Sequence, residues 1–390
     1  GDGKVTTPGL SGRDWANAVA IKPDGRIVTA GFSNNGVNDD FNAVVYKADG
    51  SLDGSFDGDG KVTTQILGGN DYANGVAIQA DGKFVAAGYT DNGSNLDFAL
   101  VRYGSNSAAA PRRTPFDFDG DGKTDLAIFR PGPGEWWYLK SSNGGNGAAT
   151  FGSGSDSVTP ADFTGDGKTD IAFFRPSTGF WYVLRSEDFS FYAFPFGGNG
   201  DVPVPADFDG DGKADAAVFR PTTATWYISR SSGGTTIQQF GLTTDKPVAA
   251  DYDGDGKADI AVYRPTGANG SEWWIQKSTG GSFATQFGAS TDKAVPADYT
   301  GDGKADVAYW RPSTGQWFVL RSEDLTYYGF PFGGSGDQPV PGDYDGDGKM
   351  DAAVFRPSTS TWYANRSGGG TLIQQFGQAG DLPIPNAFVR

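Results

Sequence analysis

The sequence predicts an all-β protein, a β-propeller of four-stranded blades, on three observations. First, 14% of the residues are aromatic and 60 are glycine, which is typical of many short strands joined by turns. Second, the chain repeats itself, at intervals of 44–47 residues in one part and of 57 residues in another. Third, each repeat contains four strand-length segments, and four strands in about 40–50 residues is the pattern of a propeller blade.

The first 103 residues contain two copies of the 57-residue repeat. GDGKVTT at 1–7 returns at 58–64, and the segment that starts at Trp15 returns from Tyr72. Each copy is expected to form four strands, near KVTT, AVAI, RIVTAG and FNAVVY, because these segments are rich in β-branched and aromatic residues. Residues 104–113, GSNSAAAPRR, are expected to be a linker.

Residues 114–390 contain six repeats of a second kind, each with an aspartate-rich loop. The loops begin at Asp117, Asp162, Asp207, Asp251, Asp298 and Asp343. RPSTGFWYVLRSED in the second repeat returns as RPSTGQWFVLRSED in the fifth, 136 residues later. We therefore interpret the six repeats as a duplicated unit of three blades.

The strand count leaves the number of rings open. Eight strands from the first part and 24 from the six later repeats would make eight blades. The segment PIPNAF near the C-terminus adds one extra first strand, in which Ala387 replaces the expected aspartate. A single eight-bladed ring is favoured because two blades cannot bury their faces alone. The linker favours the alternative, a separate propeller that follows the tail of a longer array.

The composition excludes several classes of function. Without Cys or His, the chain cannot form disulfides, thiolate or histidine zinc sites, or a Ser-His-Asp triad. The net charge of −16 argues against nucleic acid and anionic membranes as partners. No apolar run approaches the roughly 20 residues of a membrane span. No signal peptide is visible, and the opening GDGKVTT lies within a repeat, which leaves room for a segment before it.

The spacing of the aspartates points to a cation site. Positions 1, 3, 5 and 9 of each loop offer side-chain oxygens, and position 7 offers a backbone carbonyl. Calcium takes 6–8 such oxygens, and a glycine at position 6 suits a sharp turn with positive φ. Without a cation, carboxylates this close would repel one another. The candidate ligands are Asp117, Asp119, Asp121, Lys123 and Asp125; Asp162, Thr164, Asp166, Lys168 and Asp170; Asp207, Asp209, Asp211, Lys213 and Asp215; Asp251, Asp253, Asp255, Lys257 and Asp259; Asp298, Thr300, Asp302, Lys304 and Asp306; and Asp343, Asp345, Asp347, Lys349 and Asp351.

These loops are spaced like the first nine positions of an EF-hand, but the rest of that motif is missing. Position 12 is apolar in every loop, where an EF-hand has glutamate, and the flanking segments are predicted strands. The sequence DFDGDGKADAAVFRP instead resembles the FG-GAP/VCBS repeat of integrin α-chain propellers and bacterial surface proteins. The resemblance covers roughly residues 113–390, and the N-terminal repeats resemble the bacterial delta-sixty repeat.

The FG-GAP resemblance implies a calcium loop between the first two strands of each blade, and so about six calcium sites. Thr164 and Thr300 replace aspartate at position 3, so their two sites are expected to be weaker. The loops hold 22 of the 47 acidic residues, and six calcium ions would change the net charge from −16 to −4. We expect this calcium to be structural, because an ion that binds only the folded state stabilises it.

Three other repeated features are expected to be structural. One arginine in each of the six later repeats precedes a proline, and it is expected to stack on the following tryptophan or to pair with an aspartate, rather than to form a basic ring for an anionic ligand. The recurring tryptophans are expected to pack between blades rather than to bind sugars, although the doubled EWW sites at Trp136/Trp137 and Trp273/Trp274 are the best lectin candidates. Glu187/Asp188 and Glu323/Asp324 are expected to lie in solvated turns rather than to form a glycosidase pair.

The sequence as a whole predicts a secreted or cell-surface bacterial protein, a calcium-binding propeller that is not an enzyme. We expect it to act as a structural, adhesion or protein-interaction module with a protein or glycan ligand. One alternative is a calcium-dependent, lectin-like propeller. The other is the propeller portion of a larger surface enzyme or of an extracellular filament, with self-association into a surface assembly.

Overall fold

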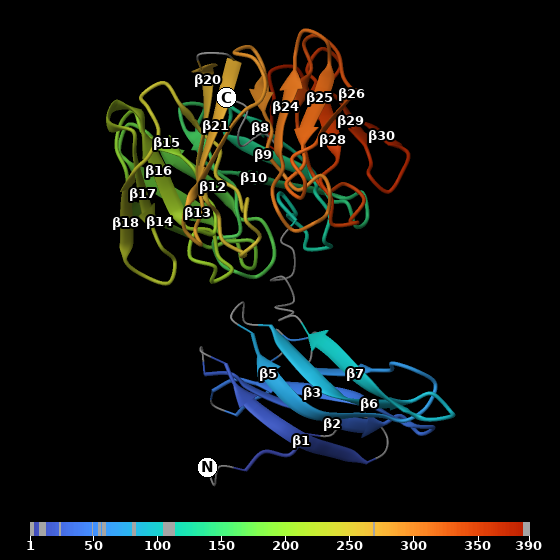
Figure 1. Ribbon diagram of the computed structural model, residues 1–390. Helices are drawn as coiled ribbons and strands as arrows, with labels where there is room; N and C mark the ends of the chain where they lie inside the picture. The colour runs from blue at the N-terminus through green and yellow to red at the C-terminus, as the bar shows by residue number, and fades with distance from the viewer. Residues whose placement is uncertain are drawn as a thin grey trace. The chain divides into compact units, whose positions relative to one another are not determined.

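The computed structural model describes residues 4–384, except 8–12, 23–24, 49, 54–55, 57–59, 80–82, 104–113 and 268–269 (Figure 1). The chain forms two compact units, Gly1–Pro111 and Arg112–Arg390. This division follows the change of repeat in the sequence. The predicted linker at 104–113 and Ala387 lie outside the described residues. None of the helices in the described part of the chain has the length and apolar character that crossing a membrane requires.

The first unit contains two sheets, one from each 57-residue copy. The four-stranded sheet has the order β1-β2-β3-β4, and the three-stranded sheet has the order β5-β6-β7. The strands are β1 (Asp14–Ile21), β2 (Ile27–Asn34), β3 (Asp39–Tyr46), β4 (Lys61–Thr64), β5 (Asp71–Ile78), β6 (Phe84–Asp91) and β7 (Leu96–Tyr103). Phe41, Val45, Phe84 and Tyr103 form a shared core between the two sheets.

One predicted strand of the first unit does not form. Lys61–Thr64 is β4 and pairs with β3, whereas the identical sequence Lys4–Thr7 is not in a strand. The two segments differ in the strands available to pair with them. Lys61–Thr64 follows β3 in the chain and bonds to it. No described strand lies in the corresponding place beside Lys4–Thr7.

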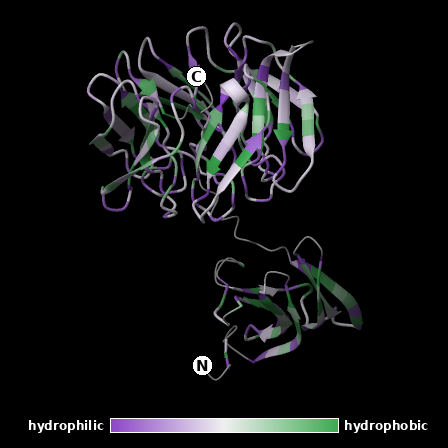
Figure 2. Ribbon diagram, turned by 90° about the vertical axis from the view of Figure 1, so that its left-hand side faces the viewer, coloured by the Kyte–Doolittle hydropathy of each residue, from purple (hydrophilic) through white to green (hydrophobic). Residues whose placement is uncertain are grey.

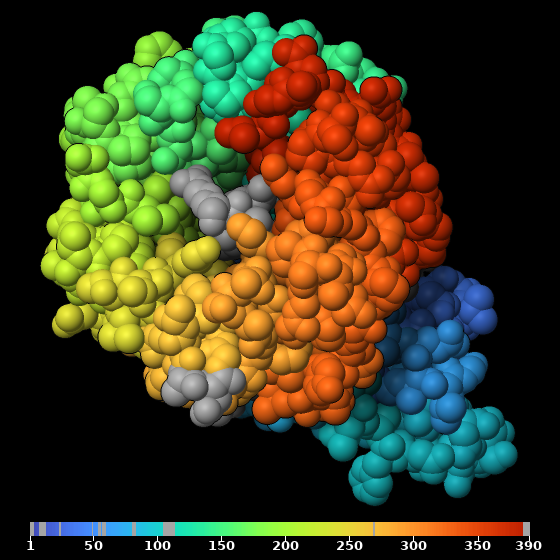
Figure 3. All heavy atoms as spheres, turned by 90° about the horizontal axis from the view of Figure 1, so that it is seen from above, coloured from blue at the N-terminus to red at the C-terminus, as the bar shows by residue number. Residues whose placement is uncertain are grey.

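The second unit contains six four-stranded antiparallel sheets, and Figure 3 shows its segments following one another around a central axis. The first sheet combines β8 (Leu126–Arg130), β9 (Glu135–Leu139) and β10 (Asn146–Thr150) with β31 (Leu382–Pro383). The second and third are β11 (Ser157–Val158), β12 (Ile171–Arg175), β13 (Phe180–Leu184) and β14 (Phe191–Pro195), then β15 (Val202–Pro203), β16 (Ala216–Arg220), β17 (Thr225–Ser229) and β18 (Thr235–Gln239). A short 3-10 helix, Pro221–Thr223, lies between β16 and β17.

The fourth, fifth and sixth sheets repeat this arrangement. They are β19 (Lys246–Pro247), β20 (Ile260–Gly267), β21 (Gly270–Gln276) and β22 (Ser282–Gln286); β23 (Lys293–Ala294), β24 (Val307–Arg311), β25 (Gln316–Leu320) and β26 (Tyr327–Pro331); and β27 (Gln338–Pro339), β28 (Ala352–Arg356), β29 (Thr361–Asn365) and β30 (Thr371–Gln375). The second strand of each sheet is buried on both faces, as its near-continuous apolar sequence requires.

The C-terminal strand completes the first sheet of the second unit. Leu382 pairs with Phe129 and Pro383 with Ile128 across the β31–β8 ladder. The extra first strand seen in the sequence is therefore used within the six later repeats. The eight-bladed ring that the strand count permitted is replaced by six sheets in the second unit, while the first two repeats form sheets of their own.

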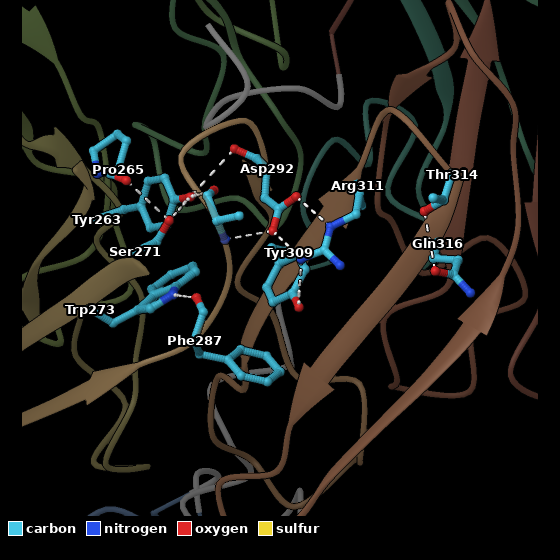
Figure 4. Close-up of polar contacts among 11 residues, drawn as sticks. Tyr263, Pro265, Ser271, Trp273, Phe287, Asp292, Tyr309, Arg311, Thr314 and Gln316 are labelled. Carbon is cyan, nitrogen blue, oxygen red and sulfur yellow. Dashed lines mark hydrogen bonds and ion pairs between the residues drawn. The ribbon is translucent and has the colours of Figure 1, made fainter. Parts of the chain in front are cut away.

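The repeated tryptophans and arginines hold the sheets together. Each tryptophan near the start of a third strand is buried and donates its indole N–H to a phenylalanine carbonyl, as Trp273 does to Phe287 at 2.9 Å (Figure 4). The buried set is Trp136, Trp181, Trp226, Trp273, Trp317 and Trp362. Packing is thus confirmed for these six side chains.

Each arginine before a proline pairs with a buried aspartate of its own sheet at 2.7–2.9 Å, as Arg311 does with Asp292 in Figure 4. The pairs are Arg130–Asp381, Arg175–Asp156, Arg220–Asp201, Arg264–Asp245, Arg311–Asp292 and Arg356–Asp337. The pairing alternative is therefore confirmed. Among the described residues, these arginines stack on a tryptophan only at Trp137 and Trp274, and the other four stack on tyrosine or phenylalanine.

A chain that ends at Gly380 should be clearly less stable than the full chain. It loses β31, the buried side chain of Ile384 and the Asp381 partner of Arg130. Breaking such a pair costs about 3 kcal/mol or more, which corresponds to a fall of roughly 6–12 °C in the unfolding midpoint. Differential scanning calorimetry checks this. A chain that ends at Ile384 keeps every one of these contacts and is the control, so equal midpoints for the two chains would contradict the prediction.

Candidate metal centres

Five of the six aspartate loops connect the first and second strands of a sheet in the second unit, and the loop that begins at Asp117 precedes β8. In the first sheet, β31 from the C-terminus takes the place of the first strand. Five of the loops end in a single antiparallel bridge between position 9 and the residue before position 1, such as Ala161 with Asp170. In the remaining loop, the Asp125 N–H donates to the Phe116 carbonyl at 3.0 Å. The predicted location within a β-hairpin is thus confirmed for five of the six loops.

The carboxylate at position 1 organises the backbone of its own loop. The Asp207 side chain accepts hydrogen bonds from the N–H groups of Gly210 and Gly212, at 2.6 and 2.8 Å. The same two bonds recur in all six loops. The glycines at positions 4 and 6 have φ between 79° and 90°, so both need the left-handed region that glycine tolerates.

Position 3 has buried oxygens that have no hydrogen-bond partner. Among the described residues, this holds in five of the six loops, for Asp119 Oδ1, Thr164 Oγ1, Asp253 Oδ1, Thr300 Oγ1 and Asp345 Oδ1. In the sixth loop, Asp209 Oδ1 accepts a bond of 3.2 Å from the Asp211 N–H. Leaving a buried acceptor without a partner costs about 1–3 kcal/mol. The repetition of this cost at one position fits oxygens that face a cation.

Positions 5 and 9 are tied to a serine that the sequence analysis did not single out. The Ser231 hydroxyl donates to Asp211 at 2.7 Å, and the Ser231 N–H donates to Asp215 at 2.7 Å. Equivalent serines occur in every repeat: Ser141, Ser186, Ser231, Ser278, Ser322 and Ser367. Their recurrence 16 or 19 residues after position 9 was a signal that could have identified them.

The loop carboxylates converge where position 3 is acidic. Three carboxylate oxygens lie within 4.8 Å of one another in each of four groups: Asp117, Asp119 and Asp125; Asp207, Asp209 and Asp215; Asp251, Asp253 and Asp255; and Asp343, Asp345 and Asp347. The two loops with threonine at position 3 have one fewer carboxylate to contribute. Oxygen-only donors at this spacing suit a hard divalent cation such as calcium.

Burial shifts the titration of the carboxyl groups in these loops. At position 9, loss of hydration raises the pKa of Asp125 to about 7, that of Asp170, Asp259, Asp306 and Asp351 to about 6, and also that of Asp215. The pKa values of Asp117, Asp207, Asp251 and Asp343 at position 1 are raised for the same reason. The folded loops therefore disfavour their own ionised form, which a bound divalent cation would offset.

The lysine at position 7 links one loop to the preceding loop. The Lys168 side chain lies against Gly120 of the preceding loop, so closely that a Cβ at Gly120 would come within 2.9 Å of Lys168 Cε. The other five loops show the same contact. In all six loops, the lysine N–H donates to the carboxylate at position 5. The backbone carbonyl at position 7 remains a predicted ligand.

The candidate catalytic acidic groups lie in surface turns, and the candidate sugar-binding tryptophans are buried or hydrogen-bonded. Glu187, Asp188, Glu323 and Asp324 are exposed, and the carboxylates of Asp188 and Asp324 accept bonds within their own turns. In the EWW segments, Trp136 and Trp273 are buried, while Trp137 and Trp274 each donate an indole N–H to the preceding glutamate. The solvated-turn prediction is thus consistent with the positions of these acidic side chains.

Comparison with known families supports the division of the chain. The FG-GAP-like repeat matches residues 117–173, 162–218, 207–262, 251–309 and 298–354. The family described as domain of unknown function (DUF5122) beta-propeller matches residues 22–56 and 79–108. A search of curated proteins finds no match.

Several solved structures resemble the chain at low identity. A protein of unknown function from Bacteroides caccae is 13% identical, with a TM-score of 0.44, covering 67% of this chain and 98% of that one. A lectin from Agrocybe aegerita that recognises non-reducing terminal N-acetylglucosamine is 16% identical, with a TM-score of 0.43 and coverage of 69% and 92%. A streptogramin B lyase is 10% identical, with a TM-score of 0.39 and coverage of 86% and 89%. Similarity at this level carries no information about ligand or activity.

The FG-GAP-like repeat matches extend without a break from residue 117 to residue 354, which is more than half of the 390 residues, and they cover the loops described above. The chain therefore belongs to the FG-GAP-like repeat family.

Proposed function

We propose that the protein is a calcium-binding β-propeller that serves outside the cell as an adhesion or protein-interaction module. The observation that supports calcium most directly is the buried, unpartnered oxygen at position 3 in five loops. In each loop it accompanies the carboxylates of positions 1, 5 and 9. No hydrogen-bond donor of the described chain fills its place, and a cation would.

The ion would be held by side-chain oxygens of positions 1, 3, 5 and 9 together with the carbonyl of position 7. When bound, calcium would neutralise the carboxylates and cross-link the two ends of the loop. The chain's own groups prepare this arrangement. The glycine N–H groups orient the position 1 carboxylate, and the serine after the third strand orients positions 5 and 9.

The neighbouring loops would share this stabilisation. The N–H at position 8 of each loop donates to the carbonyl at position 1 of the preceding loop, for example Thr169 to Asp117 at 2.6 Å. An ion that fixes one loop therefore also fixes a hydrogen-bond acceptor for the next sheet. This supports a structural role for the ions, and we propose that a partner binds on the surfaces where the repeats differ.

An extracellular, non-catalytic role is consistent with the chemistry of the chain. Calcium sites of extracellular modules have dissociation constants of about 10⁻⁴–10⁻³ M, so millimolar calcium is needed to fill them. The chain has neither His nor Cys, and its exposed carboxylate pairs lie in repeated surface turns. We propose a protein ligand in preference to a glycan, because the indole groups of the EWW segments are already engaged.

Removing calcium should lower the thermal stability of the protein. Each filled site stabilises the folded state by about 1.4 kcal/mol when free calcium is about ten times the dissociation constant. Calorimetry in excess chelator should show a lower unfolding midpoint, and added calcium should restore it. Glu187→Gln removes an exposed carboxylate outside the loops and should leave the shift unchanged. A midpoint that is the same in chelator and in millimolar calcium would rule out structural calcium.

Threonine at position 3 should produce two sites that are weaker than the other four. Thr164→Asp and Thr300→Asp each add a carboxylate to the loop and should tighten binding at that site roughly tenfold, because affinity follows the number of charged ligands. Isothermal titration with calcium measures this. The reverse substitution, Asp119→Thr, should create a third weak site. Six equivalent sites in the parent chain, unaffected by these changes, would contradict the proposed ligand set.

The choice of a protein ligand can be checked on a glycan array in millimolar calcium. We expect no glycan to bind above background, since the repeated tryptophans are buried or hydrogen-bonded. Chelator provides the control for calcium-dependent binding. A specific, calcium-dependent glycan signal would replace the protein-ligand proposal with a lectin function.

A further inference from the structure

The first unit exposes large apolar side chains on two of its strands. In β1, Trp15, Val19 and Ile21 are 64%, 64% and 69% exposed. In β7, Leu96, Phe98 and Leu100 are 63%, 101% and 72% exposed. We call these sets the β1 face and the β7 face, and Figure 2 shows the apolar residues along the strands of this unit. Repeats that end an array usually carry polar outer faces, whereas the β1 face and the β7 face are apolar.

The contact between the two repeats of the unit shows what the β1 face is built to meet. Adding 57 to its residue numbers gives Tyr72, Val76 and Ile78 of β5. Val76 and Ile78 pack against the shared core, and the Tyr72 ring lies 4.7 Å from the ring of Phe32 in β2. The residues that are exposed in the first repeat are therefore interface residues in the second.

The β7 face shows the converse relation. Subtracting 57 from its residue numbers gives Asp39, Phe41 and Ala43 of β3. These three residues are buried, and Phe41 and Ala43 belong to the core that β5 covers. Phe41 is 0% exposed, whereas its equivalent Phe98 is fully exposed. Each repeat thus has one face that covers a neighbour and one face that a neighbour covers, and the unit leaves one of each free.

The two sheets of the unit also differ in their number of described strands. The second sheet, β5-β6-β7, has no described fourth strand, while Lys4–Thr7 has the sequence of a fourth strand and is not in a sheet. Its position is nevertheless the repeat equivalent of β4. The Tyr46 hydroxyl donates to Thr7 at 2.9 Å, just as the Tyr103 hydroxyl donates to Thr64 of β4 at 3.1 Å.

We propose that the first unit associates head to tail with the first unit of a second copy of this chain. Lys4–Thr7 of one copy pairs with the free edge of β7 in the other, and the β1 face of the first packs on the β7 face of the second. The β3–β4 ladder pairs Phe41 with Thr64 and Ala43 with Val62, so the intermolecular ladder pairs Phe98 with Thr7 and Leu100 with Val5. The two contact surfaces differ, so the association is heterologous and extends to a closed ring or a filament.

A paired difference between the repeats supports this contact. Inside the unit, the Tyr72 hydroxyl donates to Asp39 at 2.7 Å across the interface. The equivalent residues on the free faces are Trp15 and Leu96, both apolar. The hydrogen-bond donor and its acceptor are thus absent together. The proposed contact would bury an indole beside a leucine, and it would leave no carboxylate without a partner at this point.

Two blocking substitutions test the head-to-tail geometry. Sedimentation velocity of the full chain should show a mass that rises with concentration above 41.0 kDa. Trp15→Asp blocks the β1 face and Phe98→Asp blocks the β7 face, so each variant alone should remain monomeric. An equal mixture of the two should form a species of twice the monomer mass and nothing larger, because each variant keeps one intact face. Ile237→Asp removes a similarly exposed apolar side chain from β18 and should associate like the parent chain.

Thermal unfolding of each variant confirms folding, and unchanged midpoints are expected since both side chains are exposed. Three outcomes would overturn the proposal: a parent chain that is monomeric at every concentration, a mixture that stays monomeric, or variants that still associate alone. The first would leave the second unit, or further repeats of the same kind, as the groups that cover these faces.

The register can be tested directly because the chain has no cysteine. Thr6→Cys and Ala99→Cys are opposite each other in the proposed ladder, as Thr63 and Asn42 are in the β3–β4 ladder. A mixture of the two single variants should form a mixed disulfide dimer on mild oxidation. Thr6→Cys mixed with Asn42→Cys should not, because Asn42 already faces β4. Equal cross-linking in both mixtures would contradict the register.

Discussion

In the second unit, the N–H at position 8 of each aspartate loop donates to the backbone carbonyl at position 1 of the preceding loop. The same bond occurs six times at 2.6–2.8 Å, and the last one connects Thr124 with Asp343. Its acceptor lies next to the carboxylate that organises the loop, so the geometry of the loop and the contact between sheets depend on each other. The two-residue first strands, the C-terminal pairing and the tryptophan core are arranged around this set of bonds.

The loops combine features that would be unfavourable without a ligand. They bury carboxylates near one another, raise the pKa of several of them and leave oxygens at position 3 without a donor. A chain that needed only tight turns could have formed them with asparagine and glycine. The repeated cost is explained if a divalent cation completes the loop.

The two units differ in how they cover the faces of their sheets. In the second unit every sheet has a neighbour on both sides, and the tryptophan near the start of each third strand is buried. In the first unit two sheets cover each other on one side only, and the equivalents of buried residues are exposed. A small number of repeats cannot bury the outer faces of its own sheets, so the first unit is suited to contact with further sheets of the same kind.

The amino-acid pattern by itself determined the four-stranded repeats of the second unit, the position of the aspartate loops before each second strand and the positive φ of Gly212. These are local properties, set by residue type and spacing over about ten positions. It could not show that β31 pairs with β8, that Lys4–Thr7 stays out of a sheet while Lys61–Thr64 joins one, or that Ser231 orients two loop carboxylates. The identical sequences Lys4–Thr7 and Lys61–Thr64 differ because a strand forms only where a neighbouring strand offers its edge. That neighbour is supplied by segments far away in the chain, and only the tertiary structure decides which segments meet.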